Sequence, residues 1–143
     1  MSLSPTLAAM LSSAIGPLIS LHTGLDVVRA IRDGLPVVAV EKLVKGGELT
    51  LAEVDRVILP RKTLAHRKTI GTLAADQGDR LVRVMRVIAQ AYDTFSDRGK
   101  AQMWLRRQTS ALGGEQPLDL LDTEEGAREV EALLTRIAHG IAA

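Results

Sequence analysis

The sequence predicts an all-α protein, and three observations lead to this fold class. Apolar residues recur at steps of three and four in several segments, which is the spacing of one helix face. No segment alternates apolar and polar residues at period two, and no hairpin turn lies between β-rich segments. The chain has only three aromatic residues, so aliphatic side chains must build the core, and such cores suit packed helices. Its 143 residues accommodate one compact domain or two very small ones.

Residues 1–22 are predicted to form an N-terminal arm, either loosely ordered or folded as a short helix against a neighbour. The segment is apolar but lacks the basic start of a secretory signal, and Gly16 and Pro17 interrupt it. It is also too broken to span a membrane. The first clear helix follows from Thr23, which is an N-cap with Asp26 three residues later, and ends at Gly34. Its predicted apolar stripe is Leu25, Val28 and Ile31.

Two further helices are predicted before residue 60. Pro36 is suited to the first position of a helix that runs to Lys45, because the missing proline N–H would be unpaired there in any case. Glycines 46 and 47 end that helix. Thr50 and Glu53 then form a capping box, in which each side chain accepts the other residue's free N–H. The buried face of this helix is predicted to be Leu51, Val54 and Ile58, and Leu59-Pro60 ends it.

Two short helices at roughly 50–58 and 61–68, joined by the Leu59-Pro60 turn, have the form of a helix-turn-helix. Leu64 can point inward while the polar residues of the second helix stay in solvent. That second helix would be the recognition helix, and its cations and Thr63 suit phosphates and base edges. The predicted DNA-binding residues are Arg61, Lys62, Thr63, His66, Arg67 and Lys68. The alternative is a basic helix whose charges are only solvated.

Residues 76–96 carry the clearest periodic signal. The pattern predicts a long helix with one buried face, made of Leu81, Val84, Met85, Ile88, Tyr92 and Phe95. Asp76 and Asp79 near its start interact favourably with the helix dipole. Beside the stripe is a basic ridge of Arg80, Arg83 and Arg86, which could contact nucleic acid, an acidic partner or, by default, water.

The C-terminal third is predicted to hold two more helices around a tight reversal. A helix from Asp97 to Gln108 is followed by Gly113-Gly114, whose lack of side chains permits the backbone to turn back. Pro117 opens a single turn rich in leucine. Asp122 with Glu125 is predicted to cap the last helix, which Gly140 can end with a positive φ. The apolar stripe of that helix is Ala127, Val130, Leu133, Leu134, Ile137 and Ile141.

Charge is distributed unevenly along the chain. The net charge is −2 over residues 1–55, +8 over 56–107 and −5 over 108–143, which leaves +1 overall. A basic middle and an acidic end suggest two different partners, or one self-association that joins them. The alternative is that helix faces of different charge are merely solvated.

Nothing in the sequence indicates an enzyme. His22, His66 and His139 lie far apart, and none has another ligand at metal-binding spacing, so neither a metal nor a cofactor is expected. No nucleophile elbow or phosphate-binding glycine loop is present. There are no cysteines, which is compatible with a reducing cytoplasm.

From the long predicted helix onward, a set of residues occurs in a fixed order: Asp79 to Val84, Ala101, Trp104-Leu105, Ala111 to Gly114, Pro117 to Leu121, Glu125 to Ala127, Val130, Leu133-Leu134, Arg136-Ile137 and His139-Gly140. In this order and spacing the chain resembles the Xre/MbcA/ParS antitoxins, over about residues 24–141. In the helix-turn-helix half, Thr63-Leu64 and Arg67 echo the family more loosely. One departure is local: the family often has a proline between the Trp-Leu pair and the Leu-Gly-Gly turn, where this chain has residues 106–110. That departure bears on where the Trp104 helix ends.

The resemblance implies an Xre-like helix-turn-helix domain at 23–75 and a toxin-binding domain at 76–143. It implies an antitoxin of a type II toxin–antitoxin pair, whose partner is a RES-domain toxin that consumes NAD or transfers ADP-ribose from it. Such antitoxins are usually homodimers that form a hetero-oligomer with the toxin, cover its active site and repress their own operon by binding operator DNA. The predicted toxin-binding residues are Trp104, Leu112, Gly113, Gly114, Pro117, Leu118, Glu125, Arg136, His139 and Gly140. Two alternatives stand beside this: a transcriptional regulator without a toxin partner, and a purely core role for Trp104, Leu112, Pro117 and Leu118.

Overall fold

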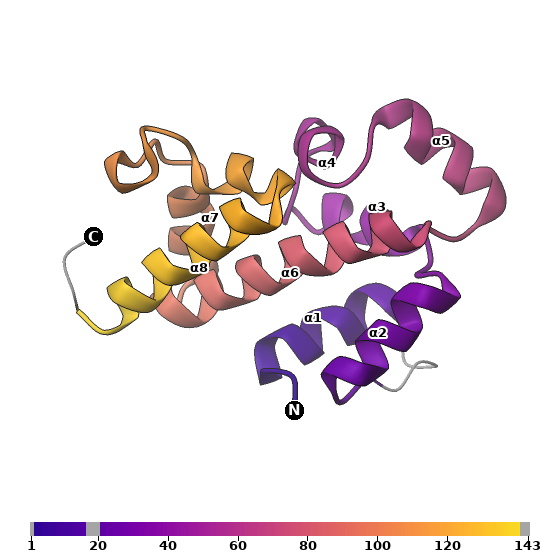
Figure 1. The fold of residues 1–143 in the computed structure, drawn as a ribbon, viewed down its shortest axis with the longest axis horizontal. Coiled ribbons are helices and arrows are strands. Elements are labelled where there is room, and N and C mark those ends of the chain that lie inside the picture. The colour runs from indigo at the N-terminus through magenta and orange to yellow at the C-terminus, as the bar shows by residue number, and fades with distance from the viewer. Residues whose placement is uncertain (1, 17–20, 141–143) are drawn as a thin grey trace.

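The computed structural model describes residues 2–16 and 21–140, and the predicted all-α class is confirmed (Figure 1). Within those residues, extended pairing is limited to three isolated bridges. No described helix is both long enough and apolar enough to cross a membrane. The elements are α1 (Pro5–Ile15), α2 (Gly24–Asp33), α3 (Val38–Lys45), α4 (Leu51–Val57), α5 (Arg61–Ile70), α6 (Ala75–Phe95), α7 (Arg98–Leu105), the 3₁₀ helices η1 (Ser110–Leu112) and η2 (Pro117–Asp122), and α8 (Glu124–Ala138).

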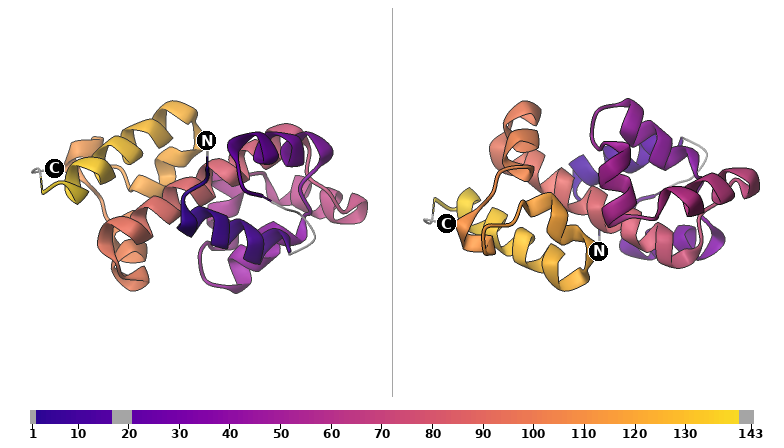
Figure 2. Two further views of the ribbon diagram at one scale, coloured as in Figure 1. Left: turned by 90° about the horizontal axis from the view of Figure 1, so that it is seen from below. Right: turned by 90° about the horizontal axis from the view of Figure 1, so that it is seen from above.

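Helix α6 runs through the middle of the molecule and contacts both halves of the chain. Helices α1 and α2 lie on one side of it and α8 on the other, while α7 packs near its C-terminal end (Figures 1 and 2). The prediction of a single buried face is therefore wrong. Val87, Ala89 and Ala91 are buried as fully as the predicted Leu81 and Ile88, because helices enclose α6 from several directions.

The N-terminal segment contains a helix that packs on its neighbours, which was one of the two predicted alternatives. The Ser4 hydroxyl accepts a hydrogen bond from the Leu7 N–H, and Pro5 occupies the first turn of α1. Leu7 and Leu11, together with Ala14, are buried where α1 meets α3 and α6. Residues 17–20 of the predicted arm lie outside the described residues, as does Ile141 of the predicted α8 stripe.

The Thr23 cap of α2 and the capping box of α4 are confirmed, but the predicted buried faces are wrong in part. On α2, Leu25 and Val28 are 65% and 38% exposed, and Val27 is buried instead. On α4, the predicted Val54 and Ile58 are buried, whereas Leu51 is 48% exposed. Both helices are short and carry apolar residues on more than one face, so the sequence does not show which face is buried. The positions of α6 and η2 decide this.

Four helix ends differ from the predicted ones. Helix α7 ends at Leu105 rather than at Gln108, because Arg106 leaves the helical conformation and its N–H donates to the Met103 and Trp104 carbonyls. Helix α3 begins at Val38 rather than at Pro36, because Pro36 forms an extended bridge with Thr72. On either side of this bridge, the Val37 N–H donates to the Gly71 carbonyl and the Leu73 N–H donates to the Leu35 carbonyl. Helix α5 continues to Ile70, where Gly71 ends it with φ +98°. The cap of α8 is Thr123 rather than Asp122, since the Thr123 hydroxyl accepts the Gly126 N–H at 2.9 Å.

Candidate functional site

Helices α4 and α5 form a helix-turn-helix unit, with α5 at one end of the molecule and α4 nearer its middle (Figure 1). The turn is short because Ile58 and Leu59 are buried and Pro60 precedes the first residue of α5. The Asp55 carboxylate accepts the Arg61 N–H at 2.9 Å, which satisfies one of the free donors at the start of α5. Leu64 is buried, as predicted, and fixes the inward side of α5.

The predicted DNA-binding residues occupy the outer part of α5. The exposed members of the set are Arg61, Lys62, His66 and Lys68, and Thr63 is half-buried. Arg67 is also half-buried, and its Nε–H donates to the Thr72 carbonyl at 2.8 Å, so this side chain holds the turn between α5 and α6. Among the described residues, Arg61, Lys62 and Lys68 have no carboxylate within ion-pair distance, which leaves their charge available to phosphates.

Four of the predicted toxin-binding residues lie in the core of the C-terminal half. Trp104 and Leu112 are 8% and 9% exposed, and Pro117 and Leu118 are buried beside them. The Trp104 ring packs on Phe95 at a centroid distance of 5.6 Å. In this structure these side chains shape the surface from within, as a core role requires, and do not present themselves to a partner.

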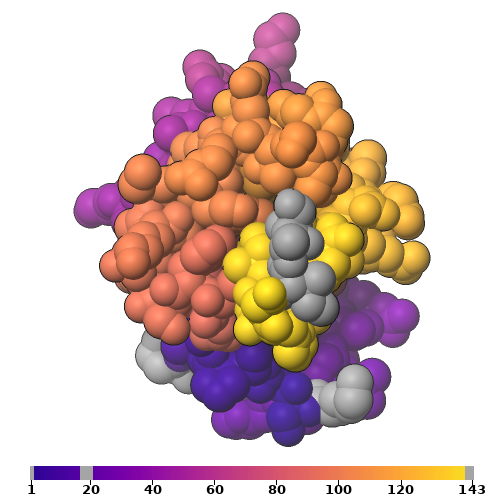
Figure 3. Space-filling model, turned by 90° about the vertical axis from the view of Figure 1, so that its left-hand side faces the viewer, coloured from indigo at the N-terminus to yellow at the C-terminus, as the bar shows by residue number. Residues whose placement is uncertain are grey.

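The other six are exposed on the same half: Glu125 in the first turn of α8, Gly113 and Gly114 just after η1, and Arg136, His139 and Gly140 at the end of α8. Figure 3 shows the last turns of α8 directly beside the segment that holds α7 and η1. Gly113 and Gly114 form a reversal with φ +68° and +84°, closed by the Gly114 N–H donating to the Thr109 carbonyl. Gly140 has the predicted positive φ, +72°.

Two arginines of the predicted basic ridge, the buried Arg83 and the half-buried Arg86, fasten α8 and η2 to α6. The expectation that the ridge contacts only water is therefore wrong for them. Arg83 is 7% exposed and donates to the carbonyl oxygens of Leu121 and Asp122, at 3.1 and 3.0 Å. Arg86 pairs with Glu131 at 3.0 Å and with a second carboxylate of α8. Burial alone would lower the pKa of Arg86, but the bonds from Glu131 raise it, and the arginine stays charged.

Further ion pairs join α4 to the C-terminal half, and sequence reasoning did not find them. Arg106 binds Glu53, and Arg56 binds Asp119 at 3.1 Å. The partners are 53 and 63 residues apart, so no local spacing could have indicated them.

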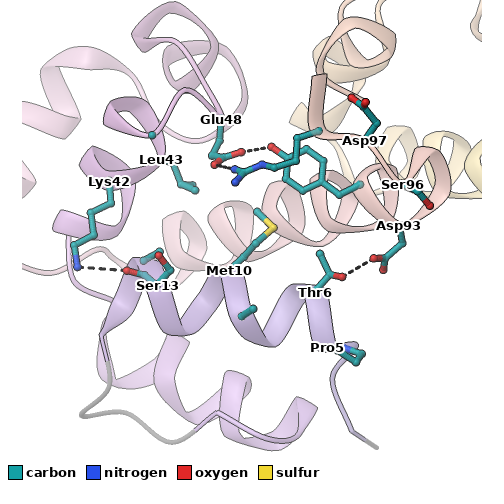
Figure 4. A pocket seen from close by; sticks show the side chains of 15 residues that line it. Pro5, Thr6, Met10, Ser13, Lys42, Leu43, Glu48, Asp93, Ser96 and Asp97 are labelled. Carbon is teal, nitrogen blue, oxygen red and sulfur yellow. Dashed lines mark hydrogen bonds and ion pairs between the residues drawn. The ribbon is translucent and has the colours of Figure 1, made fainter. Parts of the chain in front are cut away.

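A groove of about 690 Å³ lies between α1 and the segments of α3, α6 and α7 that face it (Figure 4). Its upper wall holds Glu48, whose carboxylate accepts hydrogen bonds from Tyr92 and Arg98. Burial and the bond to Glu48 raise the pKa of Tyr92, so this phenol stays protonated. These polar groups pair with one another, and the described residues include no cluster of three potential metal ligands.

The comparisons with known proteins divide the chain at α6. Residues 26–86 match the family model described as the antitoxin Xre-like helix-turn-helix domain. Residues 90–140 match the antitoxin Xre/MbcA/ParS C-terminal toxin-binding domain. The two matches meet inside α6, which is therefore shared by both halves.

Curated relatives agree with both matches. The chain is 34% identical to an antitoxin Xre of Pseudomonas putida over 121 residues, covering 84% of this chain and 76% of the relative. It is 35% identical to an antitoxin Xre of Photorhabdus laumondii over 114 residues, covering 78% and 77% of the two chains. A more distant relative is a Prs ADP-ribosylating antitoxin of Sphingobium, 31% identical over 77 residues and 48% of each chain.

Proposed function

The chain belongs to the Xre antitoxin family, and we propose that it binds and neutralises a RES-domain toxin by covering the entrance to the toxin's active site. The observation that carries this proposal is the toxin-binding domain match over residues 90–140, in which the last turns of α8 lie beside the segment that holds α7 and η1 (Figure 3). The name of the Sphingobium relative, an ADP-ribosylating antitoxin, supports a toxin with NAD-derived chemistry.

The buried and exposed members of the C-terminal set have different roles in this proposal. We call residues 98–140, from α7 to the end of α8, the platform. Trp104 and Leu118 are buried within it and fix its shape. In this proposal the toxin contacts the exposed turn at Gly113-Gly114 and the last turn of α8. The exposed Glu125 and Glu129 near the start of α8 suit a basic part of the toxin surface, and the exposed Arg136 in its last turn suits an acidic part. Reversing the charge at either end should therefore weaken the contact.

Charge reversal on the platform tests the proposal better than truncation does. A chain ending at Gly114 would lose η2 and α8, whose buried residues complete the core, so it would lose its fold as well. Arg136→Glu changes an exposed side chain in the last turn of α8. We expect it to abolish growth rescue when the chain is co-expressed with its RES-domain toxin, and to weaken the purified complex.

The matched control is Arg32→Glu, which reverses an exposed arginine in the last turn of α2. Both changes carry the same unfavourable interaction with a helix C-terminus, so they differ only in position. Arg32→Glu should rescue growth fully. If Arg136→Glu, Glu125→Arg and His139→Glu all rescue growth as well as the original chain, the platform is not the toxin-binding surface.

We further propose that the helix-turn-helix represses the chain's own operon, with a homodimer placing two copies of α5 in adjacent major grooves. The match over 26–86 supports this, as do Arg61, Lys62 and Lys68, which have no ion pair among the described residues. Replacing these three residues with alanine should weaken binding to the operon promoter and flatten its salt dependence; Arg67 is kept because it holds the turn after α5.

Lys100→Ala with Arg107→Ala is the control, because these exposed cations lie on and just after α7. An unchanged salt slope in the α5 variant would remove that helix from the interface. Light scattering of the free chain and of its complex with the toxin measures both stoichiometries. The alternative, a regulator without a toxin, would be favoured if promoter binding is intact and no toxin is bound.

A further inference from the structure

Helix α4, the first helix of the DNA-binding unit, is held by the C-terminal half of the chain. It packs against η2 as well as against α5 (Figure 1). Its inward side presents Val54 and Val57 to this contact, and both are 1% exposed. The helix-turn-helix therefore does not complete its own core.

The strongest polar link across this contact is the pair of Glu53 and Arg106. The Nε–H and Nη2–H groups of Arg106 each donate to one carboxylate oxygen of Glu53, with both N···O distances at 2.8 Å. This two-bond geometry fixes the direction of the carboxylate as well as its distance. Glu53 is 5% exposed, so few waters could substitute for the guanidinium.

Glu53 also belongs to the N-terminus of α4 itself. One of its oxygens accepts the Thr50 N–H at 2.9 Å, and its own N–H donates to the Thr50 hydroxyl at 3.2 Å. Burial alone would raise the pKa of Glu53, but the bonds from Arg106 and Thr50 hold it below its ordinary value. A single carboxylate thus joins the start of α4 to the end of α7.

Arg106 has further bonds that fix its own position. It donates to the backbone carbonyls of Gln102 at 3.2 Å and Glu48 at 3.3 Å. A second pair, Arg56 with Asp119, attaches the other end of α4 to η2 at 3.1 Å. Helix α4 is therefore tied to the platform at both ends.

We propose that Arg106 is a positioning residue for operator recognition: through Glu53 it sets the orientation of α4, and with it that of α5. This inference rests on the proposed operator binding. The platform then supplies part of the DNA-reading unit, although none of its residues touches DNA. Misplacing α5 would cost base-edge contacts, whereas non-specific attraction to phosphates would persist.

The test uses the purified full chain, a duplex from its own promoter, and an unrelated duplex of equal length. Arg106→Gln should reduce the ratio of specific to non-specific affinity by about tenfold, the size of one lost base-edge contact. The salt slope should not change. Arg107→Gln is the matched control: it removes the same charge from the next, exposed residue, which has no ion pair among the described residues, and should preserve the ratio.

Two additional measurements keep the proposal falsifiable if Arg106→Gln does not fold or the promoter is not bound. Glu53→Gln with Arg106→Gln removes both charges, so no unpaired charge is buried, and this folded variant should show the same loss of specificity. Without DNA, hydrogen exchange should accelerate in α4 and α5 while α8 stays protected. The proposal is overturned if hydrogen exchange in α4 and α5 is unchanged, or if a folded variant keeps the original affinity ratio. If the original chain does not bind its promoter, the proposed operator binding is overturned instead.

Discussion

Replacing Gly126 with alanine should destabilise the protein, although alanine is the better helix former. Gly126 lies in the first turn of α8 with no positive φ, so its backbone conformation does not require glycine. A Cβ atom there would lie 1.9 Å from the Leu120 carbonyl oxygen and 2.9 Å from its carbon. Real Cβ atoms do not approach closer than 3.0 Å, so η2 and α8 must separate by about 1 Å.

The magnitude follows from two opposing effects. Overpacking a tight contact costs about 1–3 kcal/mol, and the obstacle here is backbone, which cannot rotate away. The higher helix propensity of alanine returns up to about 1 kcal/mol. We therefore expect the free energy of unfolding to fall by about 1–2 kcal/mol, and the melting temperature to drop by about 5 °C in a chain of this length.

Urea unfolding and thermal melting of the purified chain measure this effect. Gly24→Ala is the control, since Gly24 is the first residue of α2 and a Cβ there would meet nothing within 4 Å. That variant should be as stable as the original chain or more so. If Gly126→Ala is also as stable, α8 does not dock on η2 as closely as the structure has it, and the geometry of the platform surface would be wrong.

Three other changes have clear expected outcomes. Because the pKa of Glu53 is held below its ordinary 4.5 in the folded state, its contribution to stability is complete above that value and lost as the pH falls through the folded-state pKa. Urea midpoints measured from about pH 7 to pH 3 should fall more steeply for the original chain than for Glu53→Gln. Thr123→Ala should cost about 1 kcal/mol of unfolding free energy by removing the α8 cap, whereas Asp122→Ala should be near neutral; equal losses would contradict the cap assignment. Arg83→Leu should cost about 1–3 kcal/mol, because the buried Leu121 carbonyl and the partly buried Asp122 carbonyl lose their donor; an unchanged urea midpoint would show that water replaces it.

The sequence predicted what local physics decides. The capping boxes at Thr23 and Thr50 each lie within four residues, so their spacing was sufficient to place two helix starts. The covered face of a helix depends on its neighbours. Leu25 belongs to a regular stripe yet is 65% exposed, because α2 meets α6 through its other side. Arg83 looked solvated for the same reason: its partners are carbonyls 38 and 39 residues away.

The C-terminal motif shows why a family pattern identifies the toxin-binding domain more readily than the residues that contact the toxin. Its residues keep one order in the sequence, yet Trp104 and Leu118 are buried while Glu125 and His139 are exposed. A fixed order is compatible with either a packing requirement or a partner requirement. Only the burial of each side chain in the structure distinguishes a packing role from a partner contact. Our proposal therefore assigns the toxin contact to the exposed residues of the motif.

Glu53 illustrates a different limit, in which a correct local interpretation conceals a second role. The capping box explains why a glutamate follows Thr50 by three residues, and nothing in the sequence indicates a second partner for this carboxylate. The structure places Arg106 against the same carboxylate, at the position where α7 ends. The family often has a proline after the Trp-Leu pair, and a proline could end a helix there through its backbone. In this chain α7 ends at Leu105 without one, and the side chain of the next residue bonds across to α4. The departure in sequence thus coincides with the link between the two halves, which is why Arg106 is the position where we expect a change in the platform to alter recognition of DNA.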